Sequence, residues 1–182
     1  MKQRRRGTSV VAAAVVMVVG AIVVPNLGGI ASGNTSGDRL ARQMERLRQV
    51  TGAYHNEALA IAGGFERDDH CVASPEGGMG YHYVDPDRID SVVLKDQPEG
   101  LLYAPGLNGT RVLTGVEYFK VDEDQDLATA DDRPTLFGRP FDGPMPGHGP
   151  GMPVHYDLHV WVWRSNPNGI FEQWNPRVTC PE

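Results

Sequence analysis

From Val72 onward the sequence consists of short runs rich in β-branched and aromatic residues, separated by Gly, Pro and Asn. Runs of this kind, bounded by turn-forming residues, predict β-strands. The predicted strands are residues 81–84, 89–94, 101–104, 111–121 and 154–163. Asn108 and Gly109 lie between the third and fourth strands and form a dipeptide that favours a tight hairpin. We therefore expect these two strands to pair in an antiparallel sheet.

A helix is predicted before the strands, because apolar residues recur there at helical spacing. The stripe consists of Leu40, Met44, Leu47, Tyr54, Ala58 and Ile61. Thr35 followed by Asp38 resembles a capping box at the helix start, and Gly63 with Gly64 provides a stop. Gly52 is a point where the helix can bend. The expected fold is α+β, with an N-terminal amphipathic helix packed on an antiparallel β-sheet or small open barrel.

The first 31 residues have the pattern of a signal peptide. A basic stretch, with Lys2 and residues 4–6, precedes an apolar run over residues 9–24, and Gly29-Ile30-Ala31 supplies small residues for cleavage. Residues 32–37 are then a linker, and residues 38–182 a single globular domain. An uncleaved anchor is the alternative, because the apolar run is near the shortest length that spans a bilayer. Either reading predicts a secreted or cell-envelope protein.

The charge of the exported chain argues against several partners. The full sequence has 17 basic and 23 acidic residues. Without the four basic residues of the signal peptide, 13 basic residues remain against 23 acidic ones, a net charge of −10. Such a surface repels nucleic acid and anionic membranes, so we expect no nucleic-acid partner and no membrane contact beyond the signal segment. A small ligand or a cell-envelope component is compatible with this charge.

Cys71 and Cys180 are the two cysteines of the sequence. Exported chains reach an oxidising compartment, where a pair of cysteines favours a disulfide. Ligation of a metal by the two thiolates is the alternative reading. The predicted bond would connect the C-terminus to the region just after the helix.

Residues 122–153 are acidic at first and rich in Pro and Gly afterwards. We expect a long loop here, of the kind that forms a lid over a functional site or remains without fixed structure. The apolar residues within 136–141 predict that part of this loop docks on the body of the domain.

The last predicted strand carries the first candidates for a site. Side chains of a strand alternate between two faces, so one face of 154–163 presents His155, Asp157, His159, Trp161 and Trp163. This composition is typical of a pocket wall. Residues two apart on a face are separated by about 6.6 Å and residues four apart by about 13 Å. Asp157 and His159 can therefore share one metal ion, whereas further ligands must come from other strands.

Two other predicted strands supply such ligands, His82 and Glu117. Glu117 shares its strand face with Leu113 and Phe119, and a buried carboxylate needs a cation, a metal or a hydrogen-bond donor. His82, Glu117 and His159 would form a two-histidine, one-carboxylate set for a transition metal such as Zn, Cu or Fe, with Asp157 as a further candidate ligand. Trp161, Trp163 and His155 are the candidate lining of a ligand pocket.

The same residues allow other readings. The histidines and carboxyl groups could form a structural hydrogen-bond network, or carry out acid–base chemistry without a metal. The best-supported function is binding of a metal ion or small ligand. The alternatives are an extracellular metal-dependent enzyme at the same site and a cell-envelope structural or interaction protein without a site.

Several motifs resemble those of a protein family. "GGMGYHY", "GVEYF", "LFGRPF" and "YDLHVWVWRSNPNGIFEQWNPRVTC", preceded by "AYHNEALAIAGGF", are similar to an uncharacterised family of small exported bacterial proteins common in actinobacteria. The resemblance covers nearly all of the chain after the signal peptide. It implies export and a single domain, and it carries no activity, cofactor or catalytic residue. His82, Glu117 and His159 lie inside these motifs, whereas His155 departs from the family pattern.

Overall fold

The computed structural model describes residues 35–148 and 151–181. The predicted signal peptide and most of the predicted linker therefore lie outside the described residues. Helix α1 spans Ser36–Thr51, so the helix begins two residues earlier than predicted. Thr35 and Asp38 form the expected capping box. Among the described residues, no helix has the length and apolar character that crossing a bilayer requires.

The helix bends at Gly52, as the sequence predicts. A short 3-10 turn, Gly52–His55, separates α1 from a second helix, α2, at Glu57–Ala62. The 3-10 turn changes the phase of the helical stripe. As a result Ala60 is buried, whereas Ala58 and Ile61 from the predicted stripe are exposed.

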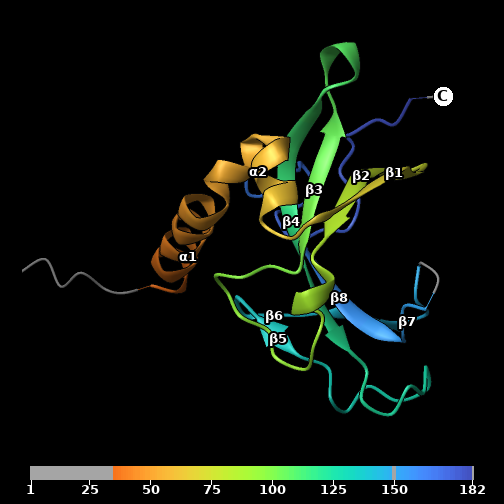
Figure 1. Ribbon diagram of the computed structural model, residues 1–182. Helices are drawn as coiled ribbons and strands as arrows, with labels where there is room; N and C mark the ends of the chain where they lie inside the picture. The colour runs from red at the N-terminus through yellow and green to blue at the C-terminus, as the bar shows by residue number, and fades with distance from the viewer. Residues whose placement is uncertain (1–34, 149–150, 182) are drawn as a thin grey trace, which may run out of the picture. The chain divides into compact units, whose positions relative to one another are not determined.

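Six strands form one antiparallel sheet that curls into a half-barrel (Figure 1). The strands are β1 (Glu66–Ser74), β2 (Gly77–Val84), β3 (Gly100–Pro105), β4 (Arg111–Val121), β7 (Asp142–Met145) and β8 (His155–Val160). Their order is β1-β2-β3-β4-β8-β7, and β5 (Thr135–Leu136) pairs with β6 (Arg139–Pro140) in a separate small sheet. The α+β fold is confirmed. So is the β3–β4 hairpin, whose turn places Asn108 and Gly109 at positive φ.

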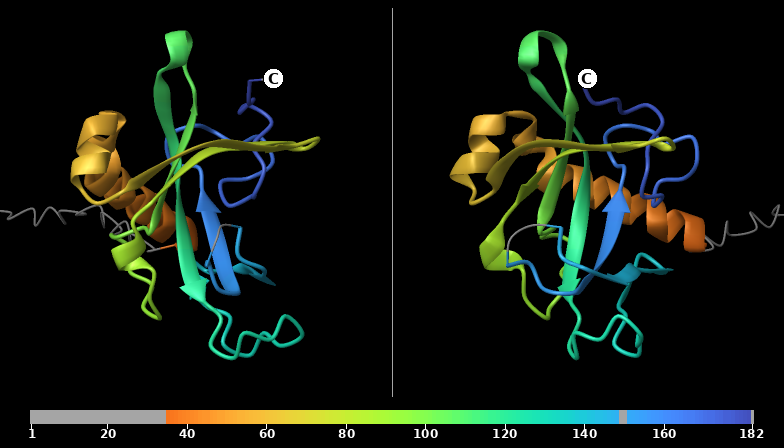
Figure 2. Two further views of the ribbon diagram at one scale, coloured as in Figure 1. Left: turned by 45° about the vertical axis from the view of Figure 1, so that its right-hand side comes forward. Right: turned by 90° about the vertical axis from the view of Figure 1, so that its right-hand side faces the viewer.

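The main hydrophobic core lies between helix α1 and one face of this sheet. Met44 and Leu47 of the helix pack there against aromatic and aliphatic side chains of β2, β3, β4 and β8. The largest of these fully buried side chains are Tyr83, Tyr103, Tyr118 and Tyr156. Figure 2 shows the helices on one side of β4 and the C-terminal segment on the other. The sheet is therefore covered on both faces by different parts of the chain.

The second face of the sheet is partly covered by residues 161–180. Trp161 and Val178 pack there against Leu102 and Ala104 of β3. The predicted disulfide is present between Cys71 of β1 and Cys180, with an S–S distance of 2.01 Å. It joins the C-terminal segment to the edge strand β1.

Three parts of the chain differ from the prediction. Residues 89–94 form no strand; instead, the Asp90 side chain accepts a hydrogen bond from the Val92 amide, and such local bonds compete with strand pairing. Strand β1 was not predicted, because an edge strand with one exposed face carries polar residues that give no apolar alternation. Residues 122–153 include β5, β6 and β7, and Leu136 and Phe141 dock in the core as expected.

Candidate metal centre

Three strands bring His82, Glu117 and His159 to the sheet face opposite helix α1. Glu117 of β4 and His159 of β8 are direct partners in the β4–β8 ladder, so their side chains leave the sheet on the same face. His82 lies on β2 and pairs with Leu102 of β3. Because β3 runs between β2 and β4, the His82 side chain must reach over one intervening strand to meet Glu117.

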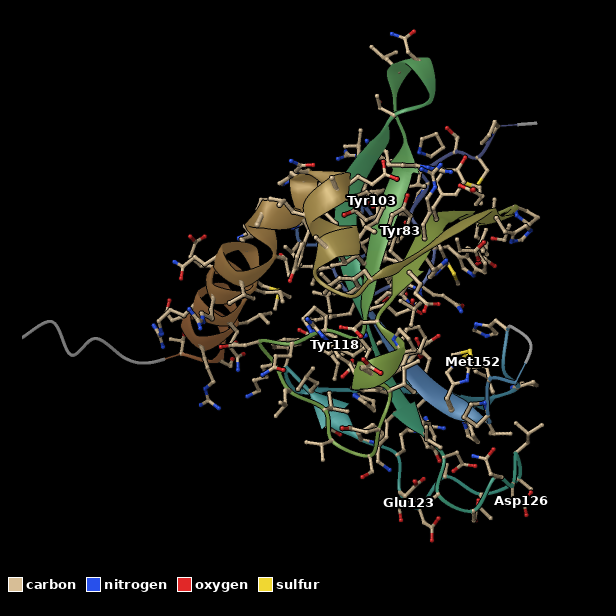
Figure 3. All side chains as sticks on the ribbon, in the orientation of Figure 1. Tyr83, Tyr103, Tyr118, Glu123, Asp126 and Met152 are labelled. Carbon is tan, nitrogen blue, oxygen red and sulfur yellow. A yellow bond between two sulfur atoms is a disulfide. The ribbon has the colours of Figure 1, made fainter. Side chains whose placement is uncertain are left out.

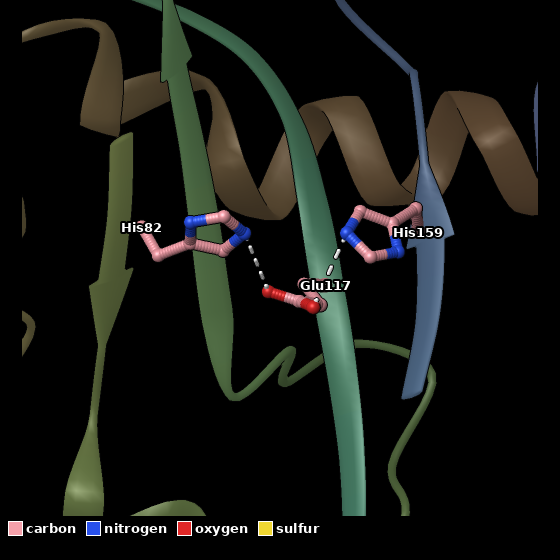
Figure 4. Close-up of side chains that lie close together, drawn as sticks. All are labelled: His82, Glu117 and His159. Atoms are coloured by element: carbon pink, nitrogen blue, oxygen red, sulfur yellow. Dashed lines mark ion pairs between the residues drawn. The ribbon is translucent and has the colours of Figure 1, made fainter. Parts of the chain in front are cut away.

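The carboxylate of Glu117 lies between the two imidazoles (Figure 4). The distance from His159 Nε2 to Glu117 Oε1 is 3.2 Å, and that from His82 Nε2 to Glu117 Oε2 is 3.5 Å. One ligand atom from each of the three residues can be chosen so that all lie within 4.8 Å of one another. Ligands that share one tetrahedral ion through bonds of about 2.0–2.2 Å lie about 3.3–3.6 Å apart, so side-chain adjustments of about 1 Å would bring the three atoms to one ion. The three residues predicted from the sequence therefore converge.

Gly100 of β3 makes this convergence possible. It is the ladder partner of Glu117, on the strand that His82 must cross. A Cβ atom at Gly100 would lie 3.1 Å from Glu117 Cβ and 3.1 Å from Phe119 Cε2. A glycine inside a strand can mark such a close approach, and this signal is present in the sequence, although the sequence analysis did not use it.

Replacing Gly100 by alanine is expected to disturb both the site and the fold. Glu117 would have to shift by a few tenths of an ångström, and overpacking of this kind costs about 1–3 kcal/mol. We expect a lower free energy of unfolding in urea and about tenfold weaker binding of Co²⁺. Gly52→Ala is the control, because its added Cβ would meet Trp163 at an ordinary 3.8 Å in helical backbone. Equal effects of the two substitutions would contradict the role given to Gly100.

The centre is almost entirely buried. The side chain of His82 is 16% exposed, that of Glu117 2% and that of His159 0%. Glu117 Oε2 and both ring nitrogens of His159 make no hydrogen bond within the described part of the chain. The 3.2 Å contact thus lacks hydrogen-bond geometry. Buried polar atoms without a partner cost about 1–3 kcal/mol each, which argues against a purely structural network.

Burial also sets the protonation of the three residues. It lowers the pKa of His82 to about 4 and that of His159 to about 3. Burial, followed by the charges of Asp157 and Glu99, raises the pKa of Glu117 well above its usual range. At neutral pH the two imidazoles are therefore neutral, which is the form that binds metals, and a bound cation would offset the burial that disfavours the charged form of Glu117.

Asp157 lies on β8 beside both His159 and Glu117, close enough to Glu117 for the two carboxyl groups to interact directly. Its Oδ1 is 3.8 Å from Nδ1 of His159, whereas Nε2 of His159 faces Glu117. Burial raises the pKa of Asp157 to about 7. A carboxylate on the far nitrogen of a ligating histidine orients the ring and increases its basicity. At 3.8 Å, however, this contact is longer than a hydrogen bond, so Asp157 adjoins the three-residue set without orienting the His159 ring.

Glu99 is a further buried carboxyl group that the sequence analysis did not identify. It is 2% exposed, and its Oε2 accepts a hydrogen bond from the Phe119 amide at 3.1 Å. Burial raises its pKa to about 8, while Asp90 raises and Arg88 lowers it to smaller extents. No pattern of spacing singles out this residue in the sequence.

Glu99→Gln is expected to change how stability depends on pH. The pKa of Glu99 is higher in the folded state than in the unfolded state. Its contribution to stability is therefore fully present below about pH 4.5 and is lost as the pH rises through about 8. The free energy of unfolding of the glutamine variant, relative to that of the natural protein, should therefore rise by about 1.4 kcal/mol per pH unit between about pH 5 and 7.5. Urea unfolding across this range measures the difference. Parallel curves for the two proteins would show that Glu99 titrates normally.

The three residues predicted to line a pocket are distributed over two faces. Trp161 is buried on the same face as the centre, and its Nε1 donates a hydrogen bond to the Glu172 carbonyl. Trp163 packs on His55 on the helix side, with ring centroids 4.3 Å apart, and donates to Thr51. Strand β8 ends at Val160, so the alternation that would unite the two tryptophans does not continue. His155 is buried at the start of β8.

Comparisons with protein-family models, with curated proteins and with solved structures find no match to this chain.

Proposed function

We propose that this protein binds one divalent transition-metal ion through His82, Glu117 and His159. The observation that carries the proposal is the convergence of one ligand atom from each residue within 4.8 Å. Two neutral imidazoles and one carboxylate suit Zn²⁺ and Fe²⁺. An ion at this position would give the unpartnered nitrogen of His159 and oxygen of Glu117 their missing partners.

Metal analysis and titration of the untagged protein test this function. We expect one equivalent of Zn²⁺ or Co²⁺ to bind, with the visible absorption of four- or five-coordinate Co²⁺. His82→Asn should weaken binding about 100-fold, or about 3 kcal/mol, because one of three ligands is lost. His55→Asn is the matched control, since His55 lies at the helix against Trp163. An ion held by the native site should also stabilise the fold. Binding of less than about a tenth of an equivalent, without such stabilisation, would contradict the proposal.

A metal-dependent enzyme at the same centre is the second candidate. Three protein ligands leave a coordination position for water or substrate, as in catalytic zinc sites. His82 is the ligand with access to solvent. One surface cavity, of about 180 Å³, is lined mainly by residues of helix α1. Another, of about 360 Å³, lies between the β1–β2 turn and the C-terminal segment. None of the three ligands lines either cavity. The burial of Glu117 and His159 leaves little room for a large substrate and favours binding over catalysis on one.

The proposed location is outside the cytoplasm, either secreted or in the cell envelope. The Cys71–Cys180 disulfide supports it, because such bonds persist in oxidising compartments. The pattern of a signal peptide in the first 31 residues and the resemblance to exported actinobacterial proteins agree with this proposal. N-terminal sequencing of protein recovered from the culture medium or envelope fraction tests both export and cleavage.

A further inference from the structure

A second group of potential metal ligands lies in the segment that connects β7 to β8. Two methionines and two histidines alternate there at spacings of three, four and three residues: Met145, His148, Met152 and His155. Their donor atoms are thioether sulfur and imidazole nitrogen. Both types are neutral at neutral pH, so the set has a softer character than the carboxylate-containing centre described above.

Strand pairing and a ring contact bring three of these residues together. Met145 of β7 is the ladder partner of His155 of β8, so their Cβ atoms face each other across the strands. The rings of His148 and His155 meet edge to face, with their centroids 4.9 Å apart. His155 thus has a methionine on one side and a second histidine on another.

Backbone packing places the fourth residue beside them. A Cβ atom on Gly147 would lie 2.8 Å from Met152 Cβ and nearer still to the Met152 carbonyl oxygen, so the two chain segments touch at this point. Met152 is therefore held against the residue that precedes His148. Figure 3 shows Met152 within the segment that leads into β8. The two methionines and His148 are only partly buried or exposed, so an ion can reach the group from solvent.

The protonation of His155 leaves one nitrogen available as a ligand. Its Nδ1 lies 3.1 Å from the Pro153 carbonyl oxygen, which accepts a hydrogen bond and thereby selects the tautomer with a proton on Nδ1. Its Nε2 then carries a free lone pair. This atom is buried and has no hydrogen-bond partner within the described part of the chain, and the residue is 1% exposed. A backbone carbonyl that fixes a histidine in this way is typical of metal-ligating histidines.

We propose that Met145, His148, Met152 and His155 bind a soft monovalent ion, Cu(I). Thioether ligands select Cu(I) over harder ions, and a neutral ligand set suits a single positive charge better than a double one. The site shares no ligand with the His82 centre, and its His155 is four residues from His159 on one strand, about 13 Å away. It does not depend on the function proposed for that centre.

Anaerobic titration with Cu(I) in competition with a colorimetric chelator such as bicinchoninate tests this site. We expect the full-length untagged protein to bind one Cu(I) and X-ray absorption to show sulfur ligands. Met145→Leu/Met152→Leu should weaken Cu(I) binding about 100-fold, and His148→Asn about tenfold. These positions are only partly buried or exposed, so the fold should persist, which circular dichroism checks. Met79→Leu and His55→Asn are the matched controls.

Two outcomes would overturn the proposal. One is Cu(I) binding by the double methionine variant with the affinity of the natural protein. The other is an equal loss of Cu(I) affinity in Glu117→Gln, which would place the ion in the His82 centre. Failure of Zn²⁺ to bind the natural protein would contradict only the function proposed above, because Glu117 is not a ligand of the Cu(I) site.

Discussion

Glu117→Gln is expected to abolish the stabilisation that Zn²⁺ gives to the natural protein. With free Zn²⁺ at about 1,000 times its dissociation constant, the folded state gains about 4 kcal/mol. For a domain of this size, that gain raises Tm by about 8–16 °C. The glutamine has nearly the shape of the glutamate, but it brings no negative charge to the ion and presents an amide N–H₂ group to the imidazoles. Thermal unfolding with and without Zn²⁺ measures the effect.

Without metal, the free energy of unfolding of Glu117→Gln should lie within about 1 kcal/mol of that of the natural protein, because burial already favours the uncharged form of Glu117. Glu45→Gln is the control, since it removes an exposed carboxyl group of helix α1 on the other side of the sheet and is expected to retain the full shift with Zn²⁺. If Glu117→Gln still gains stability from Zn²⁺, the ion binds elsewhere.

Removing the disulfide is expected to have the second large effect. Cys71 and Cys180 are 109 residues apart in the sequence, and crosslinking a loop of about this length stabilises a fold by about 4–5 kcal/mol in the chain-entropy view. Cys71→Ala/Cys180→Ala should lower the free energy of unfolding in urea by about this amount. The reason is that the crosslink restricts the unfolded chain.

The natural protein measured with a thiol reductant serves as the control and should behave like the double variant. The variant that remains folded should still bind Zn²⁺, because neither cysteine is among the three ligands. A loss below about 1 kcal/mol would mean that the C-terminal segment holds its place by packing alone, through Trp161 and Val178.

The elements with strong local signals were predictable from the sequence. The helix has an apolar stripe and a capping box, and the β3–β4 hairpin has its Asn-Gly turn; both are present. The helical stripe continues to Tyr54 and fails at Ala58 and Ile61, because the 3-10 turn, held to the sheet by the hydrogen bond from Tyr103 to the Tyr54 carbonyl, changes its phase. Strand β1 gives no apolar alternation, because edge strands are solvated on one face. Neither the change of phase at the 3-10 turn nor the edge position of β1 can be predicted from local residue propensities.

The candidate site was predictable in its chemistry and less so in its geometry. Histidine and glutamate within apolar runs indicate buried polar groups that need partners, and this reasoning selected His82, Glu117 and His159. Their meeting point depends on strand order, with β8 next to β4 and Gly100 on the strand between His82 and Glu117. Trp163 left the predicted face because β8 ends three residues before it. Strand order and strand ends arise from tertiary contacts between distant segments.

The three ligands come from three strands that are far apart in the chain, β2, β4 and β8. A slip of one residue in the β4–β8 ladder would turn His159 to the opposite side of the sheet and take it away from Glu117. Uptake of the proposed ion would consequently report correct strand assembly. An ion available during maturation would be retained by the native register and lost by misfolded chains, so its uptake would act as a checkpoint on the newly folded protein.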